Sequence, residues 1–298
     1  MKCYKPDVYK PKWVNYEIKK ELKLEKMKGK AFLMVFLFAV GLHCRSQNDI
    51  GSKQLNKITF EKSDYGLIFT TILINNRKVK AMIDFGDQHV LQLSSTLASE
   101  LGVKTEKAGY QVSDVYGNTW DVKRGTVNKL VVGSLTESDV AFTSQEGEIE
   151  AVSRQIGTEF HAVLGWGYFS RYFTEIDYSN STFTLSDNRG FFHDAIFSVP
   201  FNKDANQLII KAKVNGQEVN FMIDTGSPVT VVDPEVLVNF QGEEFGFVLQ
   251  SESFKVKAYE QDLSILSDLE VVCILGGDFL ADWKIVIDPE RSLLHFKK

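Results

Sequence analysis

Two segments of this chain, 140 positions apart, have nearly the same sequence, and this internal repeat constrains the fold more than any other feature. Residues 221–230 are FMIDTGSPVT, and residues 81–90 are AMIDFGDQHV. Each copy is an apolar run that ends in Asp-x-Gly, with the aspartates at Asp84 and Asp224. A repeat of this kind predicts two similar lobes, each of which presents one aspartate to a shared site.

The repeat extends beyond these motifs. Without a gap, residues 70–86 align with residues 210–226, and both copies alternate apolar and polar residues around an Asn-Asn or Asn-Gly pair. This pattern predicts a β-hairpin before each aspartate, because Asn and Gly tolerate the positive φ of a two-residue turn. Residues 163–177 align with residues 274–288 in the same way, each with Leu-Gly after an apolar strand and Ile-Asp at the end.

The paired aspartates indicate a particular chemistry. Two carboxylates held close together cannot both ionise easily, so they share a proton. One carboxylate then acts as a base toward a water molecule while the other acts as an acid. Asp84 and Asp224 are therefore the candidate catalytic residues.

Together these motifs resemble those of the two-lobed aspartic proteases, particularly the bacterial retropepsin-like kind. The resemblance covers about residues 58–298 and is carried by Asp-Phe-Gly at 84–86, Asp-Thr-Gly-Ser at 224–227, Val-Leu-Gly at 163–165 and Ile-Leu-Gly at 274–276. It implies an all-β fold of two pseudo-symmetric acid-protease lobes with a cleft between them. It also implies peptide hydrolysis by a water that Asp84 and Asp224 activate, with no metal or other cofactor.

The same resemblance implies how the chain is divided and how the catalytic loops are supported. It places the first lobe at 58–188 and the second at 195–298, after an N-terminal segment at 1–47. The two Leu-Gly segments are expected to pack behind the loops. The residues expected to support the loops are Gly86, Thr225, Gly226 and Ser227, and in the family the hydroxyl at the position of Ser227 hydrogen-bonds the catalytic carboxylate.

The first copy departs from the family pattern at two positions. Phe85 stands where the family has a hydroxyl that reaches across the axis, and the loss of two such hydrogen bonds costs about 1–3 kcal/mol. Asp87 stands where the second copy has Ser227. At about 4 Å and an effective dielectric of about 20, its charge would repel that of Asp84 by about 4 kcal/mol. Asp87 therefore either turns outward or disturbs the proton sharing.

These departures leave three interpretations open. The chain is an active aspartic peptidase with an unusual first lobe, or an impaired relative that binds peptides or an envelope partner in the cleft. The third interpretation is a structural protein that keeps only the barrels. The retention of both aspartates favours the first interpretation, whereas Phe85 and Asp87 favour the second.

In the family, a hairpin of the first lobe folds over the cleft, and residues 108–126 are its expected counterpart. Tyr116 and Trp120 flank a Gly-Asn turn that begins at Gly117, and their aromatic side chains are expected to cover a bound peptide. The alternative is an ordinary surface hairpin with aromatic packing.

The N-terminal segment has the pattern of a targeting signal. Residues 31–42 form a run of twelve apolar residues behind Lys28 and Lys30, too short to span a bilayer comfortably and typical of a signal peptide. We expect a signal or anchor helix here, export to the periplasm or cell envelope, and membrane contact only through this segment. Cys44 follows the run and is a candidate for lipidation, although His43 is larger than the residue that usually precedes a lipidated cysteine.

Charge and cysteine content narrow the set of partners. The net charge of the chain is −5, but the first 30 residues hold ten lysines against four acidic residues, which leaves −11 for residues 31–298. Such an acidic body argues against nucleic acid as a partner. Cys273 is the single cysteine of the predicted lobes, so no disulfide framework forms. We expect a two-lobed monomer that acts on a peptide or protein substrate.

Overall fold

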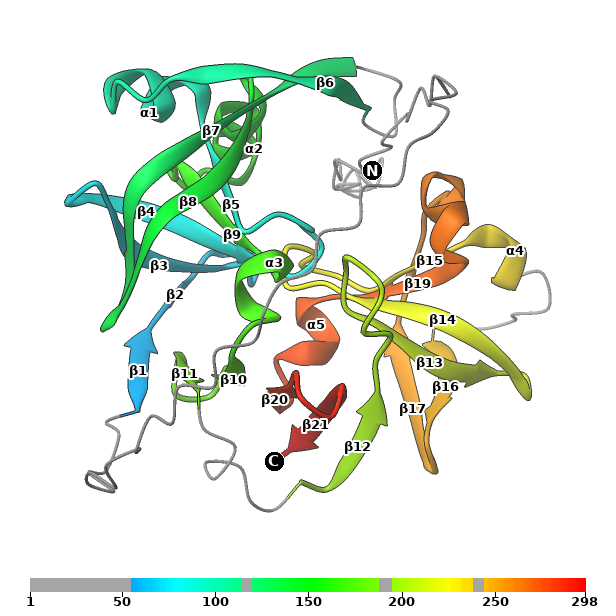
Figure 1. The fold of residues 1–298 in the computed structure, drawn as a ribbon. Helices are drawn as coiled ribbons and strands as arrows, with labels where there is room; N and C mark the ends of the chain where they lie inside the picture. Colours follow the sequence, from blue (N-terminus) through cyan, green and yellow to red (C-terminus); the bar gives the residue numbers. More distant parts are fainter. Residues whose placement is uncertain (1–54, 114–118, 188–194, 238–243) are drawn as a thin grey trace, which may run out of the picture.

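The computed structural model describes residues 55–113, 119–187, 195–237 and 244–298. Within these residues the chain forms three β-sheets joined by short helices (Figure 1). One sheet belongs to the first half of the sequence, one belongs to the second half, and the third takes strands from both halves. The prediction of an all-β protein with two barrel-like lobes is confirmed.

The eight-stranded sheet forms the first lobe. In spatial order its strands are β2 (Glu61–Lys62), β3 (Ile68–Ile74), β4 (Arg77–Asp84), β9 (Ala162–Gly165), β5 (Leu91–Leu93), β8 (Leu135–Gln145), β7 (Thr119–Val132) and β6 (Thr105–Ser113). Strand β3 also pairs with β7, so the sheet curls back on itself. The predicted hairpin is β3–β4, and its turn residues Asn75 and Asn76 have φ of 49° and 68°.

The seven-stranded sheet forms the second lobe. In spatial order its strands are β17 (Glu252–Lys257), β16 (Glu244–Leu249), β13 (Ile209–Val214), β14 (Gln217–Ile223), β19 (Val271–Leu275), β15 (Val231–Val232) and β18 (Tyr259–Glu260). The second predicted hairpin is β13–β14, and its turn has φ of 51° at Asn215 and 82° at Gly216.

The six-stranded sheet lies beneath the two lobes and joins them (Figure 1). In spatial order its strands are β1 (Asn56–Thr59), β11 (Thr182–Ser186), β10 (Phe173–Asp177), β20 (Lys284–Asp288), β21 (Leu293–Lys297) and β12 (Phe197–Pro200). The antiparallel pairing of β10 with β20 brings the ends of the two repeats together. One cluster of buried apolar side chains extends through both halves, from Phe60 to Phe296.

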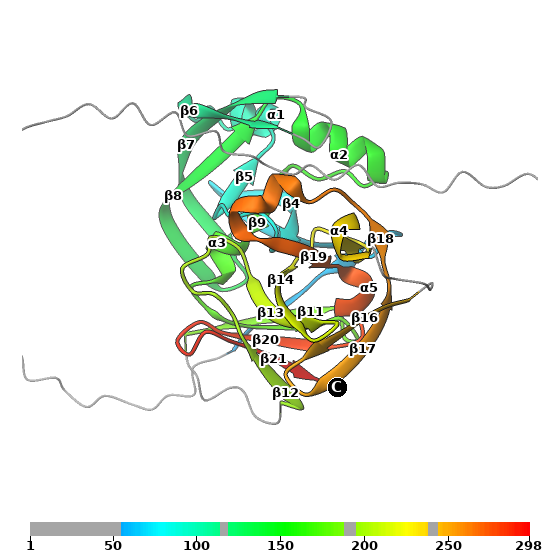
Figure 2. The same ribbon diagram turned by 90° about the vertical axis from the view of Figure 1, so that its right-hand side faces the viewer.

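The helices are short and lie between strands. They are α1 (Ser95–Glu100), α2 (Glu148–Ile156), α3 (Trp166–Phe169), α4 (Pro234–Leu237), α5 (Gly277–Leu280) and the 3-10 helix η2 (Ser264–Leu269). Figure 2 shows α1 and α2 on the first lobe, at the far end from β20 and β21. Helices α3 and α5 follow the two Leu-Gly segments, so the second repeated block has the same strand, helix, strand order in each half.

The predicted segment 1–47, with its signal or anchor helix and Cys44, lies outside the described residues, and the lobe boundaries remain predictions. Among the helices that the structure does describe, none is both long and apolar enough to cross a membrane.

Candidate active site

The two Asp-x-Gly loops are held in place by matching strand pairs. Strand β4 runs parallel to β9, and this pairing sets Asp84 beside Gly165. In the second lobe β14 runs parallel to β19, and Asp224 directly follows the end of β14. Each Leu-Gly glycine sits against the back of a loop. A Cβ atom on Gly165 would lie 2.3 Å from the His89 carbonyl oxygen, and one on Gly276 would lie 2.4 Å from a carbonyl oxygen of the second loop. Only glycine allows this approach.

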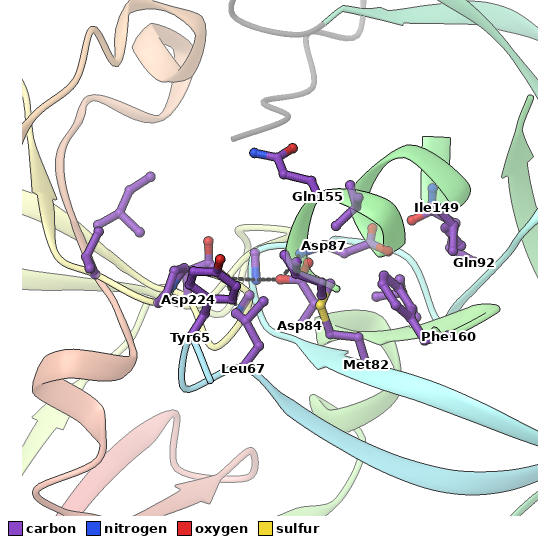
Figure 3. Close-up of a pocket in the computed structure, with 18 of the residues that line it drawn as sticks. Tyr65, Leu67, Met82, Asp84, Asp87, Gln92, Ile149, Gln155, Phe160 and Asp224 are labelled. Atoms are coloured by element: carbon purple, nitrogen blue, oxygen red, sulfur yellow. Dashed lines mark hydrogen bonds between the residues drawn. The ribbon is translucent and has the colours of Figure 1, made fainter. Parts of the chain in front are cut away.

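The two aspartates face each other across the interface between the lobes (Figure 3). A Cβ atom on Gly86 would lie 2.7 Å from Asp224 Cγ, and one on Gly226 would lie 2.5 Å from Asp84 Cγ. The Gly86 N–H donates to Asp84 Oδ1 at 2.8 Å and to Asp224 Oδ1 at 3.2 Å. The Gly226 N–H donates to Asp224 Oδ1 at 2.7 Å. Each glycine therefore lets its loop approach the carboxyl group of the other lobe.

Burial raises the pKa of both carboxyl groups, but to different extents. The pKa of Asp84 is raised well above its ordinary value by burial first, then by the charge of Asp224 and then by that of Asp87. The pKa of Asp224 is also raised by burial, but hydrogen bonds from the Asp84 side chain and from backbone N–H groups oppose the rise. Such a pair holds one proton more tightly than two isolated carboxyl groups would, and the nearby charge of Asp87 favours the placement of that proton on Asp84.

Asp87 does not turn outward. Its side chain is only 4% exposed, and Oδ1 accepts from the backbone N–H of His89 at 2.9 Å and lies 2.6 Å from His89 Nδ1. Burial alone would lower the pKa of His89, but the carboxylate of Asp87 outweighs this, so the pKa is raised. The raised pKa favours the protonated form of His89, whose charge offsets part of the charge that the sequence places beside Asp84.

His89 also links the catalytic loop to strand β6 of the predicted cleft-covering hairpin. Its Nε2 lies 3.4 Å from the hydroxyl of Tyr110 on β6. Of the predicted cleft-covering hairpin, Tyr116 and Gly117 lie outside the described residues. Trp120 lies on β7, half-buried and paired with Val112 of β6, so the two strands of the hairpin are present. Whether the hairpin covers a peptide stays a prediction.

One threonine ties the two loops together. The Thr225 hydroxyl donates to the Ile83 carbonyl at 2.9 Å and accepts from the Phe85 N–H at 3.1 Å, both in the other lobe. The Phe85 side chain packs within its own lobe instead, with ring centroids 5.2 Å from Phe169 and 5.7 Å from Trp166. The reciprocal hydroxyl is absent, as the sequence indicates, and an aromatic core contact takes its place.

Ser227 differs from the expectation. Its hydroxyl donates to the Val229 carbonyl at 2.6 Å, so its single proton is not available to the Asp224 carboxylate. The physical reason is local, because a serine hydroxyl readily bonds a backbone group two residues away in a turn. The backbone N–H of Ser227, rather than its side chain, lowers the pKa of Asp224.

A cavity of about 330 Å³ surrounds the aspartates and is lined by both lobes. The first lobe contributes apolar side chains that include Met82, Ile149 and Phe160, and the second contributes Met222 and Ile274. Met82 and Met222 are equivalent positions of the repeat, so the two sides of the cavity match near the aspartates. The cavity can accept apolar groups on both sides of a bond placed between the carboxyl groups.

The sequence patterns did not identify three polar residues near the site, His89, Gln92 and Glu148. His89 has no nucleophile motif near it, and Gln92 and Glu148 belong to segments 56 residues apart that the fold brings into hydrogen-bond contact. The repeat could not reveal Glu148, because it lies in the insertion that differs between the two halves.

Comparison with family models agrees with the geometry. Residues 70–171 match the model described as gag-polyprotein putative aspartyl protease, and residues 210–259 match the aspartyl protease model. The two matches fall on the two lobes, one on each Asp-x-Gly loop. The chain belongs to the aspartyl proteases. This protease is two-lobed and retropepsin-like, and its family is one of aspartic-type hydrolases. The comparison with curated proteins finds no match for it.

Proposed function

We propose that this protease hydrolyses peptide bonds with a water molecule activated by Asp84 and Asp224. The observation that supports the proposal is the approach of the two loops, in which each glycine leaves no room for a Cβ atom beside the opposing carboxyl group. Family membership supports the reaction class, and the geometry supports the assignment of these two residues to it.

The environments of the two carboxyl groups divide the roles between them. Asp224, stabilised as an anion by backbone N–H groups, takes a proton from the water as its oxygen attacks the peptide carbonyl carbon. Asp84, whose pKa is the more strongly raised, gives its proton to the carbonyl oxygen. When the C–N bond breaks, the proton held by Asp224 goes to the leaving amine, and the hydroxyl proton of the intermediate returns to Asp84.

The second candidate is an impaired relative that binds peptides or an envelope partner without cleaving them. Asp87 favours it, because a third buried carboxyl group beside Asp84 makes the shared proton harder to lose. His89 weakens this argument, since its ion pair with Asp87 offsets the extra charge. We therefore place the active peptidase first.

We also propose that the protein acts outside the cytoplasm as a two-lobed monomer. The support for export is the signal-like run at 31–42, and the acidic character of residues 31–298 argues against nucleic acid as a partner. The proposed partner is a peptide or protein substrate, and membrane contact is proposed only through the N-terminal segment. Fractionation of cells that express the full chain would test this, and a protein found only in the cytoplasm would contradict it.

The activity is tested with the protein lacking residues 1–47, incubated with a peptide library from pH 3 to pH 7. We expect cleavage that disappears in Asp224→Ala and in Asp84→Ala, with the fold of each variant checked by circular dichroism. Peptide binding without cleavage in the unmodified sequence would support the impaired relative. Cleavage that persists in both variants would contradict the assignment of the two aspartates.

A further inference from the structure

The first-lobe end of the cavity carries a buried carboxyl group that the proposed reaction does not use. Glu148, at the start of α2, is 5% exposed and lines the cavity together with Gln92 of β5. Its Oε2 accepts from Gln92 Nε2 at 2.6 Å, and Gln92 also donates to the side chain of Gln145 on β8. Figure 3 shows Gln92, Ile149 and Phe160 on the opposite side of Asp84 from Asp224.

Several carboxyl groups line this cavity, and some of them hold a proton. Five of its lining residues carry carboxyl groups, namely Asp64, Asp84, Asp87, Glu148 and Asp224. Among the described residues that line it, none is a lysine or an arginine. A cavity lined by one sign of charge and closed by apolar walls attracts groups of the opposite charge. His89 pairs with Asp87 and does not line the cavity, so a positive charge beside Glu148 would come from what binds there.

One carboxyl oxygen of Glu148 is available to bind a positively charged group. Among the described residues, no hydrogen-bond donor is found for Glu148 Oε1, whereas Oε2 is held by Gln92. Burial, and then the charge of Glu150, raises the pKa of Glu148 to about 8, so the carboxyl group is mostly uncharged at neutral pH. A cation that enters beside it would remove this penalty, and Glu148 would give up its proton and form an ion pair.

The shape between the aspartates and Glu148 suits a long side chain. The first-lobe wall is apolar and includes Met82, Ile149, Val152 and Phe160. Lysine and arginine bury their methylene groups against apolar surface while their charged ends find polar partners. A side chain of this kind would lay its aliphatic part along the wall and bring its charged end to Glu148.

We propose that Glu148 makes the first-lobe end of the cleft a pocket for a substrate lysine or arginine next to the scissile bond. The inference rests on the proposed peptidase function and names its substrate class. The second-lobe end, where Met222, Leu266 and Ile274 line the cavity, takes an apolar side chain on the other side of that bond.

The test uses the full-length protein in detergent and peptides that differ at one position flanking the scissile bond, lysine against norleucine. Norleucine keeps the unbranched aliphatic stem and lacks the charge. We expect kcat/KM to favour lysine by about tenfold or more. In Glu148→Gln, which keeps the size and a hydrogen-bonding end, the ratio should fall close to one. Glu146→Gln is the matched control, because its side chain is 82% exposed and pairs with Lys123 at the surface.

Several outcomes would overturn the inference. Equal cleavage of the two peptides by the unmodified protein, or a preference for norleucine over lysine, would do so, whether or not the Glu148 variant folds. So would a lysine preference that survives in a folded Glu148→Gln. These results would leave the proposed peptidase function intact, because cleavage itself would still be observed.

A binding measurement separates the two proposals if no peptide is cleaved. Fluorescence polarisation of the labelled lysine and norleucine peptides is then measured with the unmodified protein and with Glu148→Gln. Tighter binding of the lysine peptide that is lost in the variant would support the pocket while the peptidase proposal fails. Equal binding of the two peptides would contradict the pocket as well.

Discussion

At the scale of single residues, Gly86 and Gly226 set the distance between the two carboxyl groups. A methyl group at either position would meet the opposing carboxyl carbon at 2.7 Å or 2.5 Å, so the loops would have to separate. We expect Gly86→Ala or Gly226→Ala to lower kcat by about a hundredfold or more. The free energy of unfolding should fall by about 1–3 kcal/mol, as for other overpacked sites.

Steady-state kinetics and denaturant unfolding measure these two effects. Gly246→Ala is the matched control, because a Cβ atom there has its nearest neighbour at 3.9 Å. If the alanine variants keep full activity, the carboxyl groups do not act as a close pair.

Asp87 is a third carboxyl group whose charge acts on the catalytic pair of Asp84 and Asp224, called the dyad below. Since that charge raises the pKa of Asp84, Asp87→Asn should lower the pKa values at which the dyad takes up and releases its shared proton. We expect the pH range of high kcat/KM to move toward lower pH, and a pH profile of peptide cleavage would show it. Asp204→Asn, at an exposed aspartate away from the cavity, is the control.

Two other results would change the interpretation of Asp87. An unchanged pH profile would mean that the ion pair with His89 already cancels the charge of Asp87 at the dyad. A folded Asp87→Asn without activity would mean that Asp87 takes part in the reaction.

At the scale of elements, Thr225 joins the two catalytic loops, and Phe85 anchors the first loop within its own lobe. Thr225→Val keeps the shape and leaves the Ile83 carbonyl and the Phe85 N–H, both buried, without their partner. Each unsatisfied group costs about 1–3 kcal/mol, so the free energy of unfolding should drop by about 2–6 kcal/mol, measured by urea denaturation. A loss of less than about 1 kcal/mol would show that water or a backbone shift replaces both bonds.

The structure also changes what a hydroxyl at position 85 would do. The sequence alone suggests that Phe85→Thr would restore a missing tie between the lobes. Phe85 is fully buried against Trp166 and Phe169 in the first-lobe core. Removing that ring should cost about 3 kcal/mol or more, which exceeds the roughly 1 kcal/mol of a new hydrogen bond. Thermal unfolding of Phe85→Thr checks this, and an increase in stability would contradict it.

At the scale of the whole molecule, the six-stranded sheet makes the two lobes one unit. Across the pairing of β10 with β20, Lys284 Nζ lies 2.9 Å from Asp177 Oδ2. Burial alone would raise the pKa of Asp177, but hydrogen bonds from Asn180 and Lys284 lower it to about 2. A lowered pKa stabilises the fold above the unfolded value of about 3.9, and this stabilisation is lost as the pH falls through about 2.

Asp177→Asn should therefore lower the free energy of unfolding at pH 7 by about 1–2 kcal/mol, with the difference shrinking below about pH 4. Denaturant unfolding at a series of pH values measures it. A double-mutant cycle with Lys284→Met isolates the part due to the contact between the lobes. A difference that is constant from pH 7 to pH 2 would show that the charge of Asp177 does not contribute.

The sequence by itself determined the repeated architecture and the candidate dyad. The two hairpins and the two Leu-Gly segments are local patterns of turn residues and apolar alternation, and a duplicated pattern must fold into duplicated structure. Asp84 and Asp224 could be named because each ends such a pattern at the same position. The missing hydroxyl at Phe85 was visible for the same reason, since the second copy shows what should stand there.

Only the tertiary structure shows which side chains surround Asp84 and Asp224. The pairing of Asp87 with His89 depends on how the loop folds back, and the burial of Phe85 depends on α3, which lies about 80 residues further along the chain. Glu148 became part of the site only because α2 packs beside β5, in an insertion with no counterpart in the other half. The repeat encodes contacts that both lobes share, whereas charge, burial and pocket shape arise from contacts between segments that no local pattern connects.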